Sequence, residues 1–332
     1  THTPTHTHTH TIAMVDLGLD LDQYWKIDNE ALNLRKTTWL SEAYPLSDLV
    51  RPYSEWLGDM IFNTATRDGY RNHPERVFSE YHYPLLASML LYLPVVFGIK
   101  YIMKDKKPFD LQYPLILWNF IMALFSTFCF LYVLPMAFNN FKELGWSMSV
   151  CGRWCLSYGE EAFLVFLFNL SKAFEFVDTI FIVLRKKPLI FLHYYHHVVT
   201  MSFCWYMNQS AANFGCYGFH FATLNLLVHS IMYSYYGIMA MKICRFPTWV
   251  ATAITAMQIV QMIIGVAVVT TTAFCPRVDQ TAVIFGGCLY ASFFALFAQF
   301  FYNRYIAKKE AAKARSEAAA AKSRDGKKKK SQ

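Results

Sequence analysis

The chain has 332 residues, of which 55% are hydrophobic and only 16% are charged. Soluble domains carry about 25% charged residues, so this composition excludes a disordered chain or an ordinary soluble protein and predicts an integral membrane protein. The net charge of +8 is uneven: residues 1–82 hold 7 Lys+Arg against 12 Asp+Glu, and residues 305–332 hold 10 against 3. This pattern indicates a basic tail that flanks a membrane rather than binding of nucleic acid. The eight cysteines form no CxxC pair and are too scattered for a disulfide scaffold.

Four segments follow one another along the chain. Residues 1–14 are predicted to be a disordered low-complexity leader, and residues 15–82 an N-terminal segment of short interfacial helices. Residues 83–306 contain seven stretches that are long and apolar enough to cross about 30 Å of hydrocarbon as helices. We expect these spans at residues 84–103, 114–138, 162–184, 190–207, 216–240, 247–271 and 281–304. Residues 307–332 form the basic tail.

The loops between the spans predict the orientation. Loops 104–107, 185–188 and 241–246 are rich in Lys and Arg, whereas the alternating loops are poorer. Basic loops face the cytosol, which places the C-terminus in the cytosol and the N-terminus on the lumenal side. Lys329 and Lys330, the fourth and third residues from the end, match a dilysine retrieval signal. Together these features predict a multi-pass protein of the endoplasmic reticulum membrane.

The third span carries the only charges inside the seven spans, apart from helix ends: Lys172, Glu175 and Asp178. Their spacing places them roughly on one face of a helix. Each charge at this depth costs at least about 2.5–3.5 kcal/mol, so packing alone does not account for them. A functional site is the default interpretation, although an ion pair with only a structural role is the alternative.

The next three spans each carry a polar stripe. The fourth span has His193, His196 and His197 at positions i, i+3 and i+4. Buried polar groups need hydrogen-bond partners, so four neighbouring spans with polar faces predict an enclosed polar chamber. The stripes of the fifth and sixth spans consist of Asn225, His229, Met232, Tyr233, Tyr236, Thr255, Gln258 and Gln261.

Two chemistries fit a cluster of histidines. Membrane di-iron enzymes use an HxxHH box but need about eight histidines, and this chain has seven outside the leader and no HxxxH box apart from the HYYHH segment itself. The second chemistry is acyl transfer, in which a neutral imidazole is the nucleophile and a neighbouring histidine moves a proton. No GxSxG motif is present, so histidine is the best nucleophile that the chain offers.

Four motifs resemble one family. The family is the ELO family of very-long-chain fatty acid elongases. The segment KAFEFVDT is similar to its KxxExxDT motif and HYYHH to its HxxHH box, whereas NLLVHSIMYSYY is similar to its NxxxHxxMYxYY motif and TAMQIVQ to its TxxQxxQ motif. They occur in the family order and on the expected spans, and the resemblance covers about residues 35–310.

The resemblance implies a fold and a reaction. The fold is an all-α membrane protein of seven transmembrane helices, six of which form a barrel around an acyl-chain tunnel. The reaction joins a long-chain acyl-CoA to malonyl-CoA and yields a 3-oxoacyl-CoA two carbons longer, CO2 and CoA. An acyl-imidazole forms on His196, and no metal or other cofactor is required. The implied partners are acyl-CoA, malonyl-CoA, membrane lipid and the reductase and dehydratase of the elongation cycle; a homodimer is left open.

The site residues follow from the motifs and from the substrates. We expect the catalytic residues to be Lys172, Glu175, Asp178, His193, His196, His197 and His229, with Glu175 and Asp178 orienting histidine rings or neutralising Lys172. Candidate donors for the enolate and thioester oxyanions are Lys172, His193, His229, Asn225, Gln258 and the Tyr residues. The substrate contacts in the chamber are expected from Asn225, Tyr233, Tyr236, Thr255, Gln258 and Gln261. The phosphates of CoA are expected at the cytosolic mouth, near Arg185, Lys186, Lys187, Lys242, Arg245 and Arg304. The positive-inside bias alone accounts for these six basic residues equally well.

A lipid transporter or receptor that uses the same chamber for binding is the alternative function. Transporters carry helices broken by Gly/Pro pairs at mid-membrane, and here Pro94 and Pro135 lie near span ends. As for the substrate, elongases of polyunsaturated chains often have Gln five residues before the histidine box, where this chain has Pro188. It thus resembles the members that act on saturated and monounsaturated chains.

Three cysteines lie in loops that the orientation places in the oxidising lumen: Cys151, Cys155 and Cys275. From the residues alone, Cys275 pairs with Cys151 or Cys155, or all three are free thiols. The family resemblance at SVC and FC favours a disulfide between Cys151 and Cys275.

Overall fold

The computed structural model describes residues 74–152, 160–209, 216–275, 278–307, 309–310 and 317, and within these residues all regular structure is helical. The helices are α5 (Pro74–Ile102), α6 (Gln112–Cys151), α8 (Glu160–Phe174), α9 (Phe176–Leu184), α10 (Phe191–Gln209), α11 (Tyr217–Met241), α12 (Thr248–Thr272) and α13 (Gln280–Phe301), followed by the π-helical turn η3 (Tyr302–Ile306).

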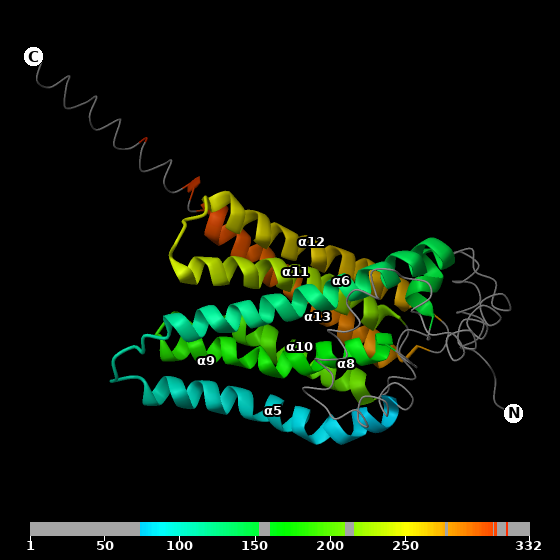
Figure 1. Ribbon diagram of the computed structural model, residues 1–332. Coiled ribbons are helices and arrows are strands. Elements are labelled where there is room, and N and C mark those ends of the chain that lie inside the picture. Colours follow the sequence, from blue (N-terminus) through cyan, green and yellow to red (C-terminus); the bar gives the residue numbers. More distant parts are fainter. Residues whose placement is uncertain are drawn as a thin grey trace, which may run out of the picture.

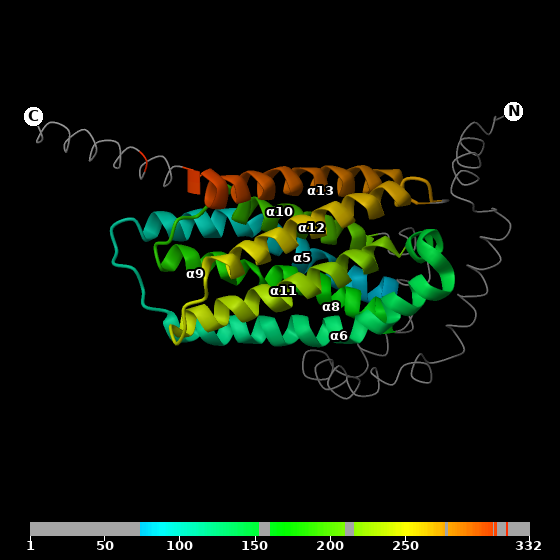
Figure 2. The same cartoon turned by 90° about the horizontal axis from the view of Figure 1, so that it is seen from above.

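The helices lie side by side along one long axis, with α8 and α9 continuing each other as one rod (Figure 1). Helix α11 packs chiefly on α6, α12 packs on α13, and α10 packs on both α5 and α13. Seen from above, α6 and α13 lie along opposite edges, with α11 and α12 between them (Figure 2). The loops 103–111, 185–190 and 242–247 and the C-terminal end of α13 all lie at one end of the bundle, which we call the basic end.

Four helices of the described region are long and apolar enough to cross a membrane: His82–Ile102, Gln112–Lys142, Thr248–Thr272 and Gln280–Ile306. Their outer faces expose large apolar side chains such as Leu90, Leu91 and Ile263, which suits contact with lipid. Helices α8 and α9, of 15 and 9 residues, are each too short to cross alone, and the rod that they form contains Lys172, Glu175 and Asp178. Helices α10 and α11 fall short of this hydropathy because they carry polar stripes. The protein is therefore an all-α, multi-pass membrane protein, and the expected number of seven spans stays a prediction.

Three predicted boundaries differ from the structure. Helix α5 begins at Pro74 rather than at 84, although its part that is apolar enough to cross a membrane begins at His82. Proline suits the first position of a helix, and the polar residues after it hide this extension from hydropathy. Helix α6 runs on to Cys151 and bends at Gly145, whose φ of 71° favours glycine. The predicted third span is divided at Glu175 into α8 and α9.

Small residues bring the helices close together. A Cβ atom on Gly265 of α12 would overlap the ring of Tyr290 on α13, and one on Gly237 of α11 would lie 3.3 Å from the ring of Phe120 on α6. Close approach over small residues is a main source of helix association in membranes, where apolar burial between helices gains little.

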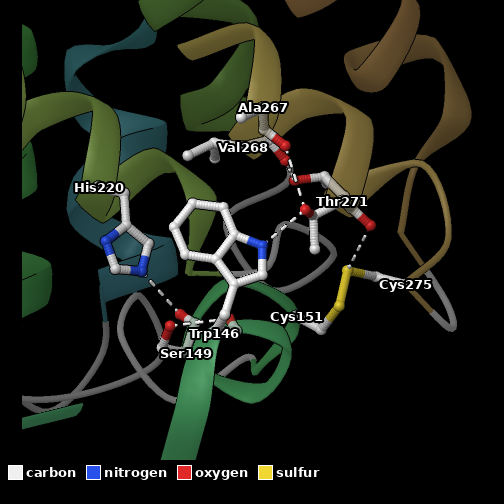
Figure 3. Close-up of a disulfide and its surroundings, with 9 residues drawn as sticks. Trp146, Ser149, Cys151, His220, Ala267, Val268, Thr271 and Cys275 are labelled. Atoms are coloured by element: carbon white, nitrogen blue, oxygen red, sulfur yellow. Dashed lines mark hydrogen bonds between the residues drawn. A yellow bond between two sulfur atoms is a disulfide. The ribbon is translucent and has the colours of Figure 1, made fainter. Parts of the chain in front are cut away.

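The end opposite the basic end is closed by a disulfide, and we call it the disulfide end. Cys151 after the bend of α6 is bonded to Cys275 after α12, as the family resemblance favoured, and their Cα atoms lie 5.2 Å apart (Figure 3). The Trp146 indole N–H donates to the Thr271 hydroxyl at 2.8 Å, and a hydrogen bond of 2.9 Å joins His220 Nε2 to the Ser149 carbonyl. Cys155, the alternative partner, lies outside the described residues.

Candidate functional site

A cavity of about 670 Å³ opens in the half of the bundle nearer the basic end. The residues from the four predicted polar stripes that line it are Glu175, Asp178, His193, His196, His197, Asn225, His229, Met232, Tyr233, Tyr236, Thr255, Gln258 and Gln261. The predicted polar chamber is thus confirmed. Lys172 is the exception, because its side chain lies behind the cavity wall.

A cluster of polar and charged side chains lies behind and along this wall. It consists of Lys172, Glu175, Asn225 and His229. The Lys172 ammonium donates to Glu175 Oε1 at 2.5 Å and to Asn225 Oδ1 at 2.8 Å. His229 Nδ1 lies 3.3 Å from the same Glu175 oxygen. Lys172 and Glu175 are 2% and 1% exposed, so each charge depends on the other for compensation. Because its carbonyl faces Lys172, Asn225 keeps its amide N–H groups for other partners.

Asp178 has hydrogen-bond partners that the sequence did not indicate. Its two oxygens accept hydrogen bonds from the Trp118 indole and the Tyr233 hydroxyl, both at 2.5 Å. Among the described residues Asp178 makes no hydrogen bond or ion pair with Lys172 or with a histidine, and these contacts are made by Glu175 instead. Asp178 ties α9 to α6 and α11, and a role of Asp178 in the reaction stays a prediction. Trp118 was missed because one tryptophan on an apolar helix gives no signal of where it points.

The histidine box lies on α10 with its three rings close together. The rings of His193 and His197 are 4.6 Å apart between centroids, and those of His196 and His197 are 5.4 Å apart. His193 Nε2 is hydrogen-bonded to the Thr179 hydroxyl at 2.9 Å, and that hydroxyl is bonded to Tyr92 at 2.7 Å. Thr179 is the last residue of the KAFEFVDT motif, so the motif contained a signal that the sequence analysis did not use.

A second, narrow cavity of about 70 Å³ leads from the first toward the disulfide end. The two cavities share four lining residues, which we call the neck: His196, Asn225, Gln261 and Met262. Beyond the neck, the narrow cavity is mostly apolar, with side chains such as Phe203, Met207, Phe221, Leu289 and Phe293. His196 therefore lies where a polar compartment meets an apolar one.

Basic residues surround the wide cavity at the basic end. Four of the six predicted phosphate contacts line this cavity: Arg185, Lys187, Lys242 and Arg304. The other two predicted contacts do not. Lys186 donates instead to the Lys104 carbonyl at 2.9 Å, and Arg245 is exposed outside the lining.

The described residues contain no group of three or more His, Cys, Asp or Glu side chains placed to hold a metal ion. The buried carboxylates are already engaged by Lys172, Trp118 and Tyr233. That the reaction needs no metal stays a prediction. What the geometry offers is imidazole, amide and hydroxyl groups around a neck between two compartments, a set suited to nucleophilic and hydrogen-bond catalysis.

Comparison with known proteins agrees with this geometry. The sequence pattern of the ELO family, described as the GNS1/SUR4 family, matches residues 77–313. "Long chain fatty acid elongase 1" of Caenorhabditis elegans is 40% identical over 275 residues, covering 77% of this chain and 93% of that protein. "Very long chain fatty acid elongase 4" of Trypanosoma cruzi is 39% identical over 239 residues, covering 68% of this chain and 80% of its own length. "Very long chain fatty acid elongase 6" of Drosophila melanogaster is 38% identical over 232 residues, covering 65% and 70%. With its histidine box at the neck of two cavities and a match over most of its length, this chain belongs to the ELO family.

Proposed function

We propose that the protein is the condensing enzyme of fatty acid elongation, an acyltransferase that joins a long-chain acyl-CoA to malonyl-CoA. The position of His196 carries this proposal. It borders both a wide cavity with a basic mouth, which suits the phosphates of CoA, and a narrow apolar cavity, which suits an acyl chain. The names of the relatives, all fatty acid elongases, support the same activity.

In the first half-reaction, the acyl chain lies in the narrow cavity and CoA extends to the basic mouth. The neutral imidazole of His196 attacks the thioester carbonyl and the C–S bond breaks. The departing thiolate takes the proton that the acylated ring loses, so CoA leaves as a thiol and an acyl-imidazole remains. At the neck, the amide N–H groups of Asn225 and Gln261 are the candidate donors to the developing oxyanion.

In the second half-reaction, malonyl-CoA occupies the wide cavity. Loss of CO2 breaks its C–C bond and leaves an enolate, so no strong base is required. The enolate carbon attacks the acyl group, the C–N bond to His196 breaks, and a proton from solvent restores the neutral ring. The product is a 3-oxoacyl-CoA with two additional carbons.

We also propose that the rods α5, α6, α8–α9, α10, α11, α12 and α13 are seven membrane spans, six of them arranged around the two cavities. The shared position of loops 103–111, 185–190 and 242–247 at one end supports this topology, because basic loops then face the cytosol together. Location in the endoplasmic reticulum stays a prediction, since Lys329 and Lys330 lie outside the described residues.

The test is incubation of membranes that contain the protein with labelled malonyl-CoA and a panel of saturated, monounsaturated and polyunsaturated acyl-CoAs. The wild type should extend acyl chains by two carbons, with saturated and monounsaturated chains preferred, and His196→Ala should abolish extension. Ser202→Ala is the matched control, because this residue of the same helix bonds to Met89 and Val198 and lines neither cavity.

Mass spectrometry after incubation with acyl-CoA alone should show an acyl group on His196. An adduct on a cysteine would overturn the mechanism. Wild-type membranes that bind acyl-CoA but form no extended product would favour the lipid transporter or receptor. Purified protein without residues 1–13 should contain no stoichiometric iron or zinc, and metal analysis that finds about one or two ions per chain would contradict the metal-free reaction.

A further inference from the structure

Three buried groups from three helices form a hydrogen-bonded chain that ends at the histidine box. The Tyr92 hydroxyl on α5 lies 2.7 Å from the Thr179 hydroxyl on α9, which lies 2.9 Å from Nε2 of His193 on α10. Tyr92 is 3% exposed and Thr179 is fully buried. These three groups make no other side-chain hydrogen bond with the described residues, so they must satisfy one another.

The burial of the chain determines the direction of its protons. Tyr92 has one O–H and one available partner, so its proton goes to the Thr179 oxygen, because an unused buried donor costs about 1–3 kcal/mol. The Thr179 proton then goes to His193 Nε2, the one acceptor that remains within reach. Nε2 of a neutral imidazole that accepts a hydrogen bond carries no proton, so the ring proton is on Nδ1.

The protonated nitrogen faces the wide cavity. The ring of His193 lines this cavity, and Nδ1 has no hydrogen-bond partner among the described residues. It is also absent from the buried unpartnered side-chain atoms, which within the described region are Asn140 Nδ2 and Thr200 Oγ1. Lys172 and His229 both contact Oε1 of the nearby buried Glu175, and no hydrogen bond or ion pair joins this carboxylate to His193 within the described region. The Nδ1–H group is therefore available to a ligand.

His193 and His196 differ in which compartment they face. His196 belongs to the neck and borders both cavities, whereas His193 borders the wide cavity alone. In the proposed reaction, the wide cavity holds the malonyl thioester while the acyl chain lies beyond the neck. A donor at His193 is thus placed for the malonyl half of the reaction rather than for the acyl tail.

We propose that Tyr92 and Thr179 are positioning residues that hold His193 as its Nδ1–H tautomer, so that His193 donates a hydrogen bond to the thioester oxygen of malonyl-CoA. This oxygen becomes the enolate oxygen when CO2 is lost, and a donor aimed at it stabilises the charge that develops there. His193 acts in this step as a donor and not as a base. The kinetic part of the inference rests on the proposed function, whereas the tautomer does not.

The tautomer is measured by ¹⁵N NMR of protein with labelled histidines, with the His193 signals identified by their loss in His193→Gln. The wild type should show a protonated Nδ1 and an unprotonated Nε2. Thr179→Val, which removes the hydroxyl at nearly constant shape, should shift the population toward protonated Nε2, and Thr179→Ser should keep the wild-type tautomer. The matched control is Thr272→Val, since Thr272 is also buried but bonds only to its own helix at Val268. A wild-type ring protonated at Nε2, or an unchanged tautomer in Thr179→Val, would overturn the proposal.

Kinetic measurements distinguish a positioning role of Thr179 and Tyr92 from a purely structural one. Thr179→Val should lower kcat about tenfold, the loss expected for one hydrogen bond made in the transition state, with the KM for acyl-CoA unchanged. Thr179→Ser should restore kcat to within about twofold. Tyr92→Phe should lower kcat less, and should have no further effect in the Thr179→Val background, because Tyr92 acts through Thr179. Equal losses in Thr179→Ser and Thr179→Val would contradict the role. If the wild type extends no acyl chain, the proposed function fails, but the tautomer is still measured.

Discussion

The two halves of the bundle are stabilised in different ways. Near the basic end, the interior holds Lys172, Glu175, Asp178 and the histidine box around a wide cavity, and the buried charges are held by specific partners. Toward the disulfide end, the interior is mostly apolar and is held by ring packing and by the Cys151–Cys275 disulfide. In the proposed function, the costly buried charges lie where the chemistry takes place, whereas the half proposed to receive an apolar chain needs only a suitable shape.

This contrast predicts how each half responds to mutation. In the polar half, removal of one partner leaves the other buried and unpaired, so a single substitution has a large effect. In the apolar half, stabilisation is spread over many small contacts, so large effects are expected only where a bond is covalent or a fit is tight.

The largest effect is expected at Glu175. Glu175→Gln leaves the Lys172 ammonium without its counter-charge at 2% exposure, which should destabilise the fold by about 3–5 kcal/mol and abolish elongation. Thermal unfolding in detergent and the elongation assay measure the two effects.

The double variant Lys172→Met, Glu175→Leu is the control, because it removes both charges together. Its unfolding midpoint should recover most of the loss while elongation stays absent. A single variant that unfolds at the wild-type temperature would show that Lys172 does not depend on Glu175.

A smaller effect is expected at the disulfide end. Cys151→Ser opens a bridge between residues 124 positions apart, and loss of such a cross-link typically costs about 2–4 kcal/mol. The unfolding midpoint should fall, whereas elongation at low temperature should persist, because the bridge lies far from His196. Cys288→Ser, at an exposed free thiol of α13, should change neither quantity. Peptide mapping without reductant checks the bond itself, and a Cys275 that is alkylated in the wild type without reductant would refute it.

A tight fit in the apolar half gives the third prediction. Gly265→Ala should destabilise by about 1–3 kcal/mol, because the new methyl group overlaps the Tyr290 ring, which cannot move without repacking the narrow cavity. Gly287→Ala is the matched control on α13, where the nearest atom would lie at an ordinary 3.7 Å. Unfolding midpoints compare the two variants, and equal midpoints would show that α12 and α13 separate freely.

The polar half was largely predictable from sequence. Helical spacing shows which residues share a face, and the cost of burying polar groups shows that such faces must meet. This was enough to place His193, Asn225, Tyr233 and Gln258 around one cavity. Of the six basic residues expected at its mouth, four line the cavity, and their contact with CoA phosphates stays a prediction.

Pairings between helices were not predictable, because spacing along one helix says nothing about the rotation of its neighbour. The bonds from Trp118 to Asp178 and from Tyr92 to Thr179 depend on how α5, α6 and α9 face one another. Division of the third span at Glu175 was hidden for the same reason, since one of the partners of this residue, His229, comes from α11. In the apolar half, hydropathy predicted helices but not the narrow cavity between them.

The smallest effect is expected at Asp279, which lies before α13 at the disulfide end, outside the predicted spans. Burial alone would raise the pKa of this carboxyl, but hydrogen bonds from the Tyr206 hydroxyl at 2.7 Å and the Thr281 N–H at 2.8 Å hold the pKa below its usual value. The folded-state pKa is lower than the unfolded value of about 3.9, so the charge stabilises the fold above that pH, and the contribution is lost as pH falls through the folded pKa. Asp279→Asn should therefore lower the free energy of unfolding at pH 7 by about 0.5 kcal/mol, as expected for an exposed charge at a helix N-terminus, and its difference from the wild type should shrink below about pH 4. Asparagine caps helices as well as aspartate does, so the variant isolates the charge from the cap.

The control is Asp105→Asn, in an exposed loop at the basic end. If the stability difference between wild type and Asp279→Asn persists unchanged at acid pH, then the hydrogen-bond geometry of the side chain, rather than its charge, stabilises this end of α13.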